Sequence, residues 1–407
     1  MRPGTAVKLG IGLLLIVAAC GREPAEPLVV EDLGEKAARL AHEVIIVDTH
    51  VDYPYRQKDE PADISQRTDN DFDYVKAREG GLDAPFMSIY IPASLQGTPA
   101  AGETAEELIG MVETLEREHP DKFAIARSPD DVQRQFAEGL VSLPMGMENG
   151  EPIAGDIAKV AHWYERGIRY IGLAHSENNH LSDSSYATEK EWNGLSPFGA
   201  EVIAEMNRLG IMVDVSHLSD EAFDDIMEIT RAPAIASHSS CRHFTPGWER
   251  NISDQMIIDL ARGGGVVQIN FGSAFLDQRV NQQSTEYWQA FREFAAAGGI
   301  ESGSPEAEAW RESYWQDKER LFADVGDVAD HIEHVVGLVG VDHVGLGSDF
   351  DGVGDSLPTG LKDVAGYPNL IRVLLERGYT DEQIEKICSG NVLRVWTEVE
   401  RIASEMQ

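Results

Sequence analysis

The sequence predicts an α/β fold of the TIM type, a (β/α)8 barrel in which eight parallel strands alternate with helices. Three observations point to it. Apolar segments of strand length recur about eight times, segments with helical periodicity separate them, and most of the strands end in a residue that can bind a metal ion. A doubly wound open sheet is the alternative architecture, but no glycine-rich phosphate turn follows the first predicted strand.

Length and composition agree with one globular domain over residues 31–407. The chain has 407 residues, of which 42% are hydrophobic and 26% are charged. Its net charge of −36 argues against nucleic acid and anionic lipid surfaces as partners, because both require basic surface.

The first residues resemble a bacterial export signal. Arg2 and Lys8 give a positively charged start, and residues 11–19 form a short apolar core. That core is too short to span a bilayer comfortably. The residues Val-Ala-Ala-Cys at 17–20 resemble a lipobox, in which the cysteine is lipidated and becomes the first mature residue. An ordinary secretory signal cut near the same place is the alternative.

We therefore expect a lipoprotein signal peptide over residues 1–19, lipidation of Cys20 and a tether over residues 20–30. Proline among glutamates is typical of such a tether. The residue after the cysteine is Gly21 and not Asp. By resemblance to the sorting rules of lipoproteins, this predicts release from the inner membrane. The expected location is the bacterial cell envelope, at the outer membrane facing the periplasm, with contact to the membrane through the lipid anchor only.

Eight segments have the composition of buried strands. Their predicted ranges are 44–50, 85–91, 141–148, 169–175, 211–217, 232–238, 265–271 and 343–349.

Helix signals fill the intervening segments. Between 196 and 210, Ser196 is the expected N-cap, Pro197 fits the first turn, and an apolar stripe ends before a glycine. Residues 219–229 follow the same pattern, with Ser219 as the cap. Thr380 and Gln383 have the spacing of a capping box before the last helix.

One connection is much longer than a barrel requires. About 70 residues separate the seventh and eighth predicted strands, well above the usual loop length. We expect a helical insertion at about 275–330, whose centre, 283–322, is rich in aromatic residues, Glu and Ala. This insertion could cover the barrel mouth, form an oligomer contact, or lie on the surface without either role. A homodimer is compatible with the second possibility.

Candidate metal ligands lie at or just after the ends of six of the eight predicted strands. They are His50, Asp52, Glu148, His175, His217, His238 and Asp349. In a parallel barrel these ends meet at one face. His50 and Asp52 are two residues apart, so on extended backbone they point to the same side.

Three or four imidazoles with several carboxylates suit zinc or a similar cation. The set is larger than one tetrahedral ion needs, and it fits two ions about 3.5 Å apart that share a carboxylate. Such a pair lowers the pKa of a bridging water and polarises a carbonyl group. The sequence thus predicts a barrel of the metal-dependent hydrolase type.

Other histidines and the cysteines have less specific settings. His331 and His334 fall in a helical segment and are expected on its solvated face, whereas His180 and His243 follow strands and are further candidates for the pocket lining. Cys241 and Cys388 are expected to be buried free thiols, although the sequence leaves open whether they pair.

Several motifs resemble the membrane (renal-type) dipeptidases, peptidase family M19, over most of the chain from Val47 to about Trp396. They are Val47-Asp48-Thr49-His50-Val51-Asp52, Gly146-Met147-Glu148-Asn149-Gly150, Asp214-Val215-Ser216-His217, Ser237-His238-Ser239-Ser240, Gly347-Ser348-Asp349-Phe350-Asp351-Gly352 and Gly390-Asn391-Val392-Leu393-Arg394-Val395. The family often has Gly-Gly-His after the bridging glutamate, whereas this chain has Asn149-Gly150-Glu151.

The resemblance implies two zinc ions and assigns a role to each site residue. His50 and Asp52 would bind one ion, His217 and His238 the other, and Glu148 would bridge the two. His175 would contact the substrate near the reacting carbon, and Asp349 would move the proton. Arg250 would bind the terminal carboxylate of the substrate, since a guanidinium forms a charge-assisted fork with a carboxylate. A surface salt bridge is the alternative role for Arg250.

The resemblance therefore implies a zinc-dependent dipeptidase that cleaves dipeptides through a metal-bridging hydroxide. A D-residue at the C-terminal side is compatible with this function. One alternative is another binuclear amidohydrolase-type barrel acting on lactams or cyclic amides. Many of those have a carboxylated lysine on the fourth strand and His-x-His on the first, where this chain has His175 and His50-x-Asp52. The other alternative is a metal-binding lipoprotein without catalysis, which would need neither Asp349 nor Arg250.

Overall fold

The computed structural model describes residues 31–300 and 304–407, together with Met1 and Gly4. Leu33–Gln407 form one compact unit, and the description below concerns that unit. The expected signal peptide, the lipidated Cys20 and the tether lie outside the described residues. Within the described part of the chain, no helix is long and apolar enough to cross a membrane.

Eight parallel strands form the central sheet in the order β1-β2-β5-β6-β7-β8-β9-β10. Their bounds are β1 Ile46–Val51, β2 Leu82–Tyr90, β5 Met145–Glu148, β6 Ile168–Gly172, β7 Met212–Asp214, β8 Ile235–Ala236, β9 Val266–Ile269 and β10 Val344–Leu346. Each predicted strand overlaps one of these eight. All are buried, as expected for a parallel sheet with helices packed around it.

The sheet closes where its first strand meets its last. The Asp52 amide donates to the Phe350 carbonyl at 2.8 Å, and the Asp349 amide donates to the His50 carbonyl at 3.0 Å. Because these bonds join the two edges, the sheet is a nearly closed (β/α)8 barrel. The barrel prediction is confirmed, and the open-sheet alternative is wrong.

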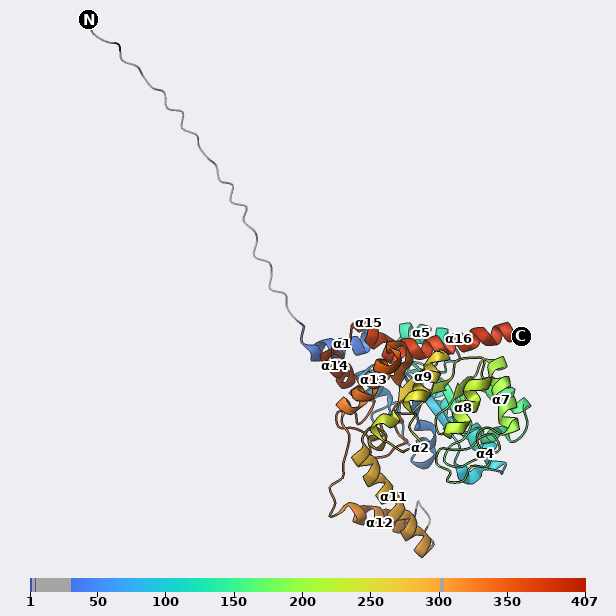
Figure 1. Ribbon diagram of the computed structural model, residues 1–407. Helices are drawn as coiled ribbons and strands as arrows, with labels where there is room; N and C mark the ends of the chain where they lie inside the picture. Colours follow the sequence, from blue (N-terminus) through green and yellow to red (C-terminus); the bar gives the residue numbers. More distant parts are fainter. Residues whose placement is uncertain (2–3, 5–30, 301–303) are drawn as a thin grey trace. The chain divides into compact units, whose positions relative to one another are not determined.

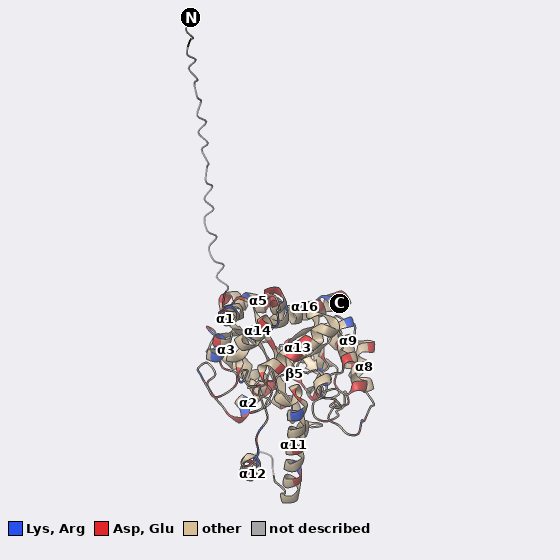
Figure 2. Cartoon of the chain, turned by 60° about the vertical axis from the view of Figure 1, so that its left-hand side comes forward, with Lys and Arg blue, Asp and Glu red and all other residues tan. Residues whose placement is uncertain are grey.

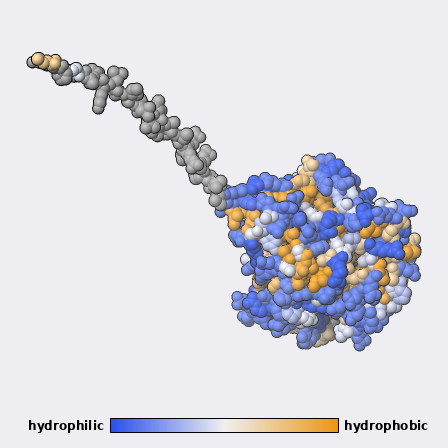
Figure 3. Space-filling model, turned by 45° about the horizontal axis from the view of Figure 1, so that its top comes forward, coloured by the Kyte–Doolittle hydropathy of each residue, from blue (hydrophilic) through white to orange (hydrophobic). Residues whose placement is uncertain are grey.

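Helices follow the strands and surround the barrel (Figure 1). They are α1 Leu33–Glu43, α2 Tyr53–Asp59, α3 Tyr74–Gly80, α4 Ala100–Glu118, α5 Pro129–Glu138, α6 Ala158–Glu165, α7 Pro197–Leu209, α8 Asp220–Ile229, α9 Asp254–Arg262, α10 Ser273–Leu276, α11 Gln278–Gly298, α12 Pro305–Trp315, α13 Val325–Val339, α14 Tyr367–Glu376, α15 Asp381–Glu385 and α16 Asn391–Met406. Acidic residues are spread over several outer helices (Figure 2), and the face shown in Figure 3 is largely hydrophilic with separate hydrophobic areas.

The predicted helix starts are confirmed. Ser196 accepts a hydrogen bond from the Gly199 amide at the start of α7, and Ser219 accepts one from Ala222 at the start of α8. Thr380 and Gln383 form the expected capping box. That box begins the short helix α15, and five π-helical residues, Lys386–Gly390, separate it from the last helix, α16.

The third predicted strand, 141–148, is divided in two. β4 (Val141–Ser142) pairs with β3 (Phe123–Ala124) in a separate two-stranded sheet, and only β5 joins the barrel. The break falls at Pro144, which has no amide hydrogen to donate. Its carbonyl accepts from the Met87 amide at 2.8 Å, so the barrel ladder begins there.

A separate hydrophobic cluster fills the barrel interior. It joins side chains from six strands to the last helix: Val47, Ala84, Phe86, Tyr170, Met212, Ile235, Val266 and Trp396. The Trp396 ring lies 5.3 Å from the ring of Phe86. The interior is therefore packed with side chains, as in other TIM barrels.

The predicted insertion is helical, and it leaves the barrel after β9. α11 extends away from the barrel and α12 lies beside its far part (Figures 1 and 2). The Trp310 ring lies 5.4 Å from the rings of both Phe291 and Phe294, so the two helices share a small aromatic core. An oligomer contact through this insertion stays a prediction.

Candidate metal centre

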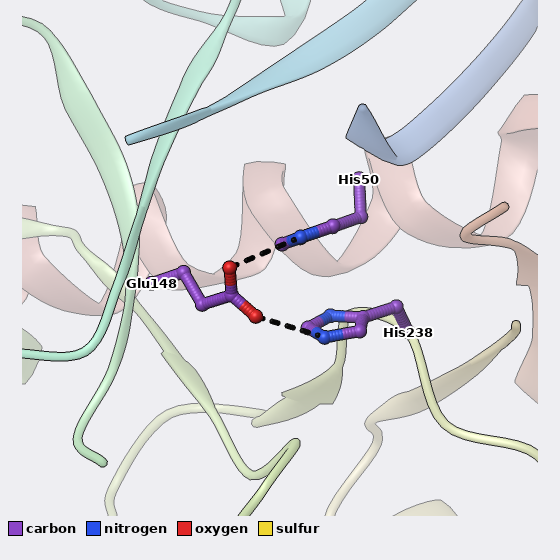
Figure 4. Close-up of side chains that lie close together, drawn as sticks. All are labelled: His50, Glu148 and His238. Atoms are coloured by element: carbon purple, nitrogen blue, oxygen red, sulfur yellow. Dashed lines mark ion pairs between the residues drawn. The ribbon is translucent and has the colours of Figure 1, made fainter. Parts of the chain in front are cut away.

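Glu148, the last residue of β5, lies between two groups of imidazole side chains. Its Oε2 atom is 3.5 Å from His50 Nε2, whereas its Oε1 atom is 3.0 Å from His217 Nε2 and 3.2 Å from His238 Nε2. Figure 4 shows the carboxylate between the rings of His50 and His238. Each oxygen therefore faces a different group of nitrogen ligands, which is the arrangement of a bridging carboxylate.

The first group consists of His50 and Asp52 beside Glu148. His50 Nε2 lies 3.4 Å from Asp52 Oδ2. Both atoms are buried and have no hydrogen-bond partner within the protein. Buried polar atoms without partners are costly, so this pair fits a bound cation well.

The second group consists of His217 and His238, whose Nε2 atoms are 2.8 Å apart. Burial lowers the pKa of both imidazoles well below its usual value, and the nearby Arg250 lowers it further. Both rings are therefore neutral at pH 7, which is the protonation state that binds a metal ion. His217 lies three positions beyond the end of β7, and its backbone is left-handed (φ 69°).

The charges around His50 and Glu148 favour a cation at the first group. Burial by itself would lower the pKa of His50, but Tyr170, Glu148 and Asp52 together raise it well above its usual value. Burial would raise the pKa of Glu148, yet the surrounding imidazoles hold it well below its usual value. Glu148 is therefore ionised, and positive charge near His50 is stabilised, which a proton or a metal ion can supply.

His175 lies beside the second group, three residues beyond β6. Its Nε2 atom is 3.6 Å from Glu148 Oε1, and its ring centroid is 4.2 Å from that of His217. Burial lowers its pKa, and its Nδ1 atom is buried without a partner. His175 is thus a neutral imidazole at the edge of the centre, able to ligate an ion or to donate to a substrate.

Asp349 completes the first group from the other end of the barrel sheet. With His50 and Asp52 it forms a set of side chains whose possible ligand atoms lie within 4.8 Å of one another. Its Oδ2 atom accepts a hydrogen bond from Asn270 Nδ2 at 2.7 Å. Burial, reinforced by the charge of Asp52, raises the pKa of Asp349 to about 8. A carboxyl group with a pKa near the working pH can both take and return a proton.

Arg250 is buried beside the second group, with an exposed fraction of 2%. It donates to Ser239 Oγ at 2.8 Å, to the His238 carbonyl at 2.9 Å and to His217 Nε2 at 3.0 Å. The surface-salt-bridge alternative is therefore wrong. A fixed guanidinium next to the metal centre can bind an anionic group of a substrate.

Three further side chains support the ligands in roles that were not predicted from the sequence. The Tyr170 hydroxyl is 2.8 Å from His50 Nδ1, and the Ser237 hydroxyl is 2.7 Å from His238 Nδ1. Ser237 also donates to Asp214 Oδ2 at 2.6 Å, so a buried carboxylate orients that imidazole through a hydroxyl. Asn270, which holds Asp349, directly follows β9, so its strand-end position was an available signal.

Gly352 leaves the space that the carboxylates occupy. A Cβ atom on it would lie 2.1 Å from Asp52 Oδ2 and 2.4 Å from Asp349 Oδ1. No side chain fits without displacing one of these groups. Steric exclusion of a side chain therefore explains why the Asp-Phe-Asp-Gly motif has glycine at its last position.

The remaining histidines lie outside this centre. His180 Nδ1 pairs with Glu151 at 3.0 Å, and His243 stacks on His334, so neither contacts the ligand set. The prediction for His331 is wrong, because this residue of α13 is fully buried and its Nδ1 atom accepts a hydrogen bond from the Cys241 amide. Cys241 and Cys388 are both buried and unpaired, as expected.

An eight-stranded parallel barrel with two adjoining histidine–carboxylate groups at the carboxyl ends of its strands defines a metal-dependent hydrolase of the barrel type. The family follows from the sequence over nearly its whole length. Residues 34–407 match the model of the family described as membrane dipeptidase (Peptidase family M19), and the chain belongs to this family.

Known relatives agree with this membership. An uncharacterised dipeptidase of Schizosaccharomyces pombe is 32% identical over 382 residues, which cover 89% of this chain and 82% of the relative. The crystal structure of a probable dipeptidase, PvdM, from Pseudomonas aeruginosa is similar with a TM-score of 0.75 and 26% identity, over 91% of this chain and 99% of that one. A metallopeptidase from Rhodobacter sphaeroides, solved with a phosphinate mimic of the dipeptide L-Ala-D-Ala, has a TM-score of 0.71 and 25% identity, over 88% of this chain and 99% of that one.

The protein is therefore a metallo-dipeptidase, an enzyme that hydrolyses peptide bonds. The alternative of a non-catalytic metal-binding lipoprotein is wrong. The barrel contains groups of side chains that could hold the metal of a metallopeptidase.

Proposed function

We propose that this enzyme is a two-zinc dipeptidase that accepts a D-residue at the C-terminal side of its substrate. The observation that carries the proposal is the division of the Glu148 carboxylate, with one oxygen toward His50 and the other toward His217 and His238. One ion would be held by His50, Asp52 and Glu148, and the second by Glu148, His217 and His238. Imidazole and carboxylate ligands in these numbers suit zinc.

Bound zinc would supply Lewis-acid polarisation of the scissile carbonyl and an activated water. The chain's own residues supply orientation and proton transfer. His175 would donate a hydrogen bond to the carbonyl oxygen, where negative charge develops during the reaction. Asp349, whose Oδ2 atom is held by Asn270 beside the first group, would accept a proton and return it to the leaving amine.

Arg250 would bind the free carboxylate of the substrate and so limit cleavage to the last peptide bond. Its guanidinium is buried, is held by Ser239 and the His238 carbonyl, and has an Nε atom without a partner. A fixed donor of this kind selects for an anion at a set distance from the reacting carbon. The C-terminal peptide bond, which is the single peptide bond of a dipeptide, would thus be placed at the metal centre.

A structurally similar protein supports the proposal that the enzyme accepts a D-residue. The Rhodobacter sphaeroides metallopeptidase, which shares 25% identity with this chain, was solved with a mimic of L-Ala-D-Ala. We expect hydrolysis of L-Ala-D-Ala and of L-Ala-L-Ala by the zinc-loaded protein, and none of D-Ala-L-Ala. Cleavage of L–L dipeptides alone would remove the stereochemical part of the proposal and leave the dipeptidase intact.

The test of the metal assignment uses two glutamates that are neighbours in the sequence. Glu148→Gln should lose both zinc ions and essentially all hydrolysis. Glu151→Gln is the matched control, because Glu151 is equally buried (both 5% exposed) but pairs with His180 outside the centre. Full activity in the Glu148 variant, or one zinc per chain in the unchanged enzyme, would overturn the two-ion assignment.

A further inference from the structure

A second cluster of possible metal ligands lies apart from the residues of the metal centre. It consists of His243, in the short helix Arg242–Phe244 after β8, Asp254, the first residue of α9, and His334, in α13. Their possible ligand atoms all lie within 4.8 Å of one another. Three separate elements thus bring two imidazoles and one carboxylate to one point, and the hydrolytic reaction uses none of them.

The geometry of the cluster suits a divalent cation. His334 Nε2 lies 2.8 Å from Asp254 Oδ1, and the rings of His243 and His334 are stacked with centroids 4.4 Å apart. His243 is exposed and the other two are partly exposed, so an ion can enter from solvent. Two nitrogens and one oxygen leave room for a water molecule in a tetrahedral zinc site.

The surroundings also favour a cation over a purely structural contact. An open groove of about 400 Å³ adjoins His334 and is lined by Phe244, Asp330, Glu333, Gly337 and Leu338. It leaves His334 accessible to solvent from that side. The net charge of −36 raises the local concentration of cations at the surface.

We propose that His243, Asp254 and His334 form an additional zinc site, separate from the metal centre in the barrel. Its affinity would be lower than that of the barrel centre, because it has three protein ligands and is open to solvent. Its position gives it a role, since His243 and Asp254 flank the segment 244–253, which carries Arg250.

An ion at this site would attach both ends of that segment to α13. The two ends already meet each other, because the Arg242 amide donates to the Ile252 carbonyl at 2.8 Å. One turn before His334, His331 Nδ1 accepts from the Cys241 amide at 3.0 Å, so α13 already holds the start of the segment. At the other end, Asp254 already pairs with His334 of α13 at 2.8 Å. The ion would replace this contact with bonds to Asp254, His334 and His243, and so stiffen the support of Arg250.

The test measures the zinc content of the full-length holoprotein at a series of buffered free zinc concentrations. The unchanged protein should bind one equivalent more than His334→Ala and His243→Ala at saturation. The matched control is His162→Ala, which removes a histidine that pairs with Glu106 and whose side chain is 48% exposed. That control should bind as much as the unchanged protein.

Because the readout is a difference between variants, it does not depend on how many ions the barrel centre holds. Equal zinc content in the unchanged protein and both cluster variants would overturn the proposal, and so would an equal loss in the His162 variant. If His334→Ala fails to fold, the exposed His243 still provides the comparison.

Two further measurements separate a bound ion from adventitious zinc elsewhere on the surface. Free zinc at about 100 times the dissociation constant of the site should raise the melting temperature by roughly 3 °C. It should also slow hydrogen exchange of the amides in 244–253. Both effects should be absent in His243→Ala, and their persistence in that variant would overturn the proposal.

Discussion

At the scale of single residues, the centre depends on groups that are not ligands. Tyr170 lies inside the barrel, and its hydroxyl is 2.8 Å from His50 Nδ1. Its ring fits there because Gly146 on the neighbouring strand has no side chain, since a Cβ at Gly146 would lie 2.0 Å from that ring. A hydrogen bond to the distal nitrogen fixes the orientation of a ligating imidazole and increases its basicity.

Tyr170→Phe removes that hydrogen bond and leaves the packing intact. We expect metal affinity at the His50 side of the centre to fall about 10–100-fold. Equilibrium dialysis against buffered zinc measures the change, and Tyr90→Phe, on strand β2 beside the His50 strand β1, is the control. Unchanged affinity would mean that packing alone orients His50.

Asp52→Ala tests the ligand that distinguishes this chain from barrels with His-x-His. The variant should lose one zinc ion per chain and most of its activity. Asp52 Oδ2 is buried and has no hydrogen-bond partner within the protein, as expected for an atom that binds a metal ion. Metal analysis and dipeptide hydrolysis on the same sample measure both effects. The circular dichroism spectrum should stay that of the folded barrel, and a zinc content equal to that of the unchanged protein would contradict the assignment.

At the scale of elements, the last helix completes the barrel. α16 places Trp396 against the interior cluster, where its side chain is fully buried. The helix is also tied to the sheet by Asn391, whose side chain donates to the Val344 carbonyl at 2.8 Å. The Gly-Asn-Val-Leu-Arg-Val motif in the tail is therefore explained by packing and not by chemistry at the centre.

Trp396→Ala should cost about 3–5 kcal/mol of unfolding free energy, because it leaves a cavity in the closed interior. Urea denaturation measures the loss. Trp288→Ala is the control, since Trp288 in α11 is 45% exposed, and its cost should stay within about 0.5 kcal/mol. Equal costs for the two variants would contradict the placement of Trp396 in the core.

At the scale of the whole molecule, the free energy of unfolding should depend on pH through Asp83, a buried carboxyl group that is not part of the metal centre. Burial raises the pKa of Asp83 to about 7, while its side chain accepts from the Ile46 amide at 3.1 Å. The folded state therefore keeps this proton up to about pH 7, whereas the unfolded chain releases it near pH 4. The contribution of protonated Asp83 to the free energy of unfolding is therefore complete below pH 4, and it is lost as the pH rises to about 7.

Asp83→Asn keeps an oxygen acceptor and removes the titration. Relative to the unchanged protein, the variant should therefore gain stability between pH 5 and pH 8. Urea midpoints at the two pH values measure this difference, and the comparison cancels the titration of the metal centre. A constant difference between the two proteins across that range would contradict the raised pKa.

The location of the enzyme stays a prediction from the first twenty residues. Cys20→Ser should abolish incorporation of labelled fatty acid and release the protein from the membrane fraction, because one thioether-linked group carries the lipid. Fractionation of cells that express both forms measures it. Retention of the serine variant in the membrane fraction would contradict anchoring through Cys20.

Much of the fold and most of the site could be predicted from local patterns. Strand ends that carry His50, Glu148 or His238 are visible in the sequence, because strand periodicity and residue chemistry are both local properties. Breaks inside an apolar run are harder to see. Pro144 divides such a run. Where the barrel strand begins depends on which neighbouring strand donates a hydrogen bond to the Pro144 carbonyl.

The barrel, the family and the set of candidate ligands could be derived from the amino-acid sequence, since each depends on residue type and spacing. Three other features are visible only in the folded chain: which Glu148 oxygen faces which imidazoles, the burial of Arg250, and the support that Tyr170 and Asn270 give to the ligands. These are relations between strands distant in the chain, which closure of the barrel brings within hydrogen-bond distance. The His243, Asp254 and His334 cluster has the same origin, because its three residues come together only when α13 packs beside α9.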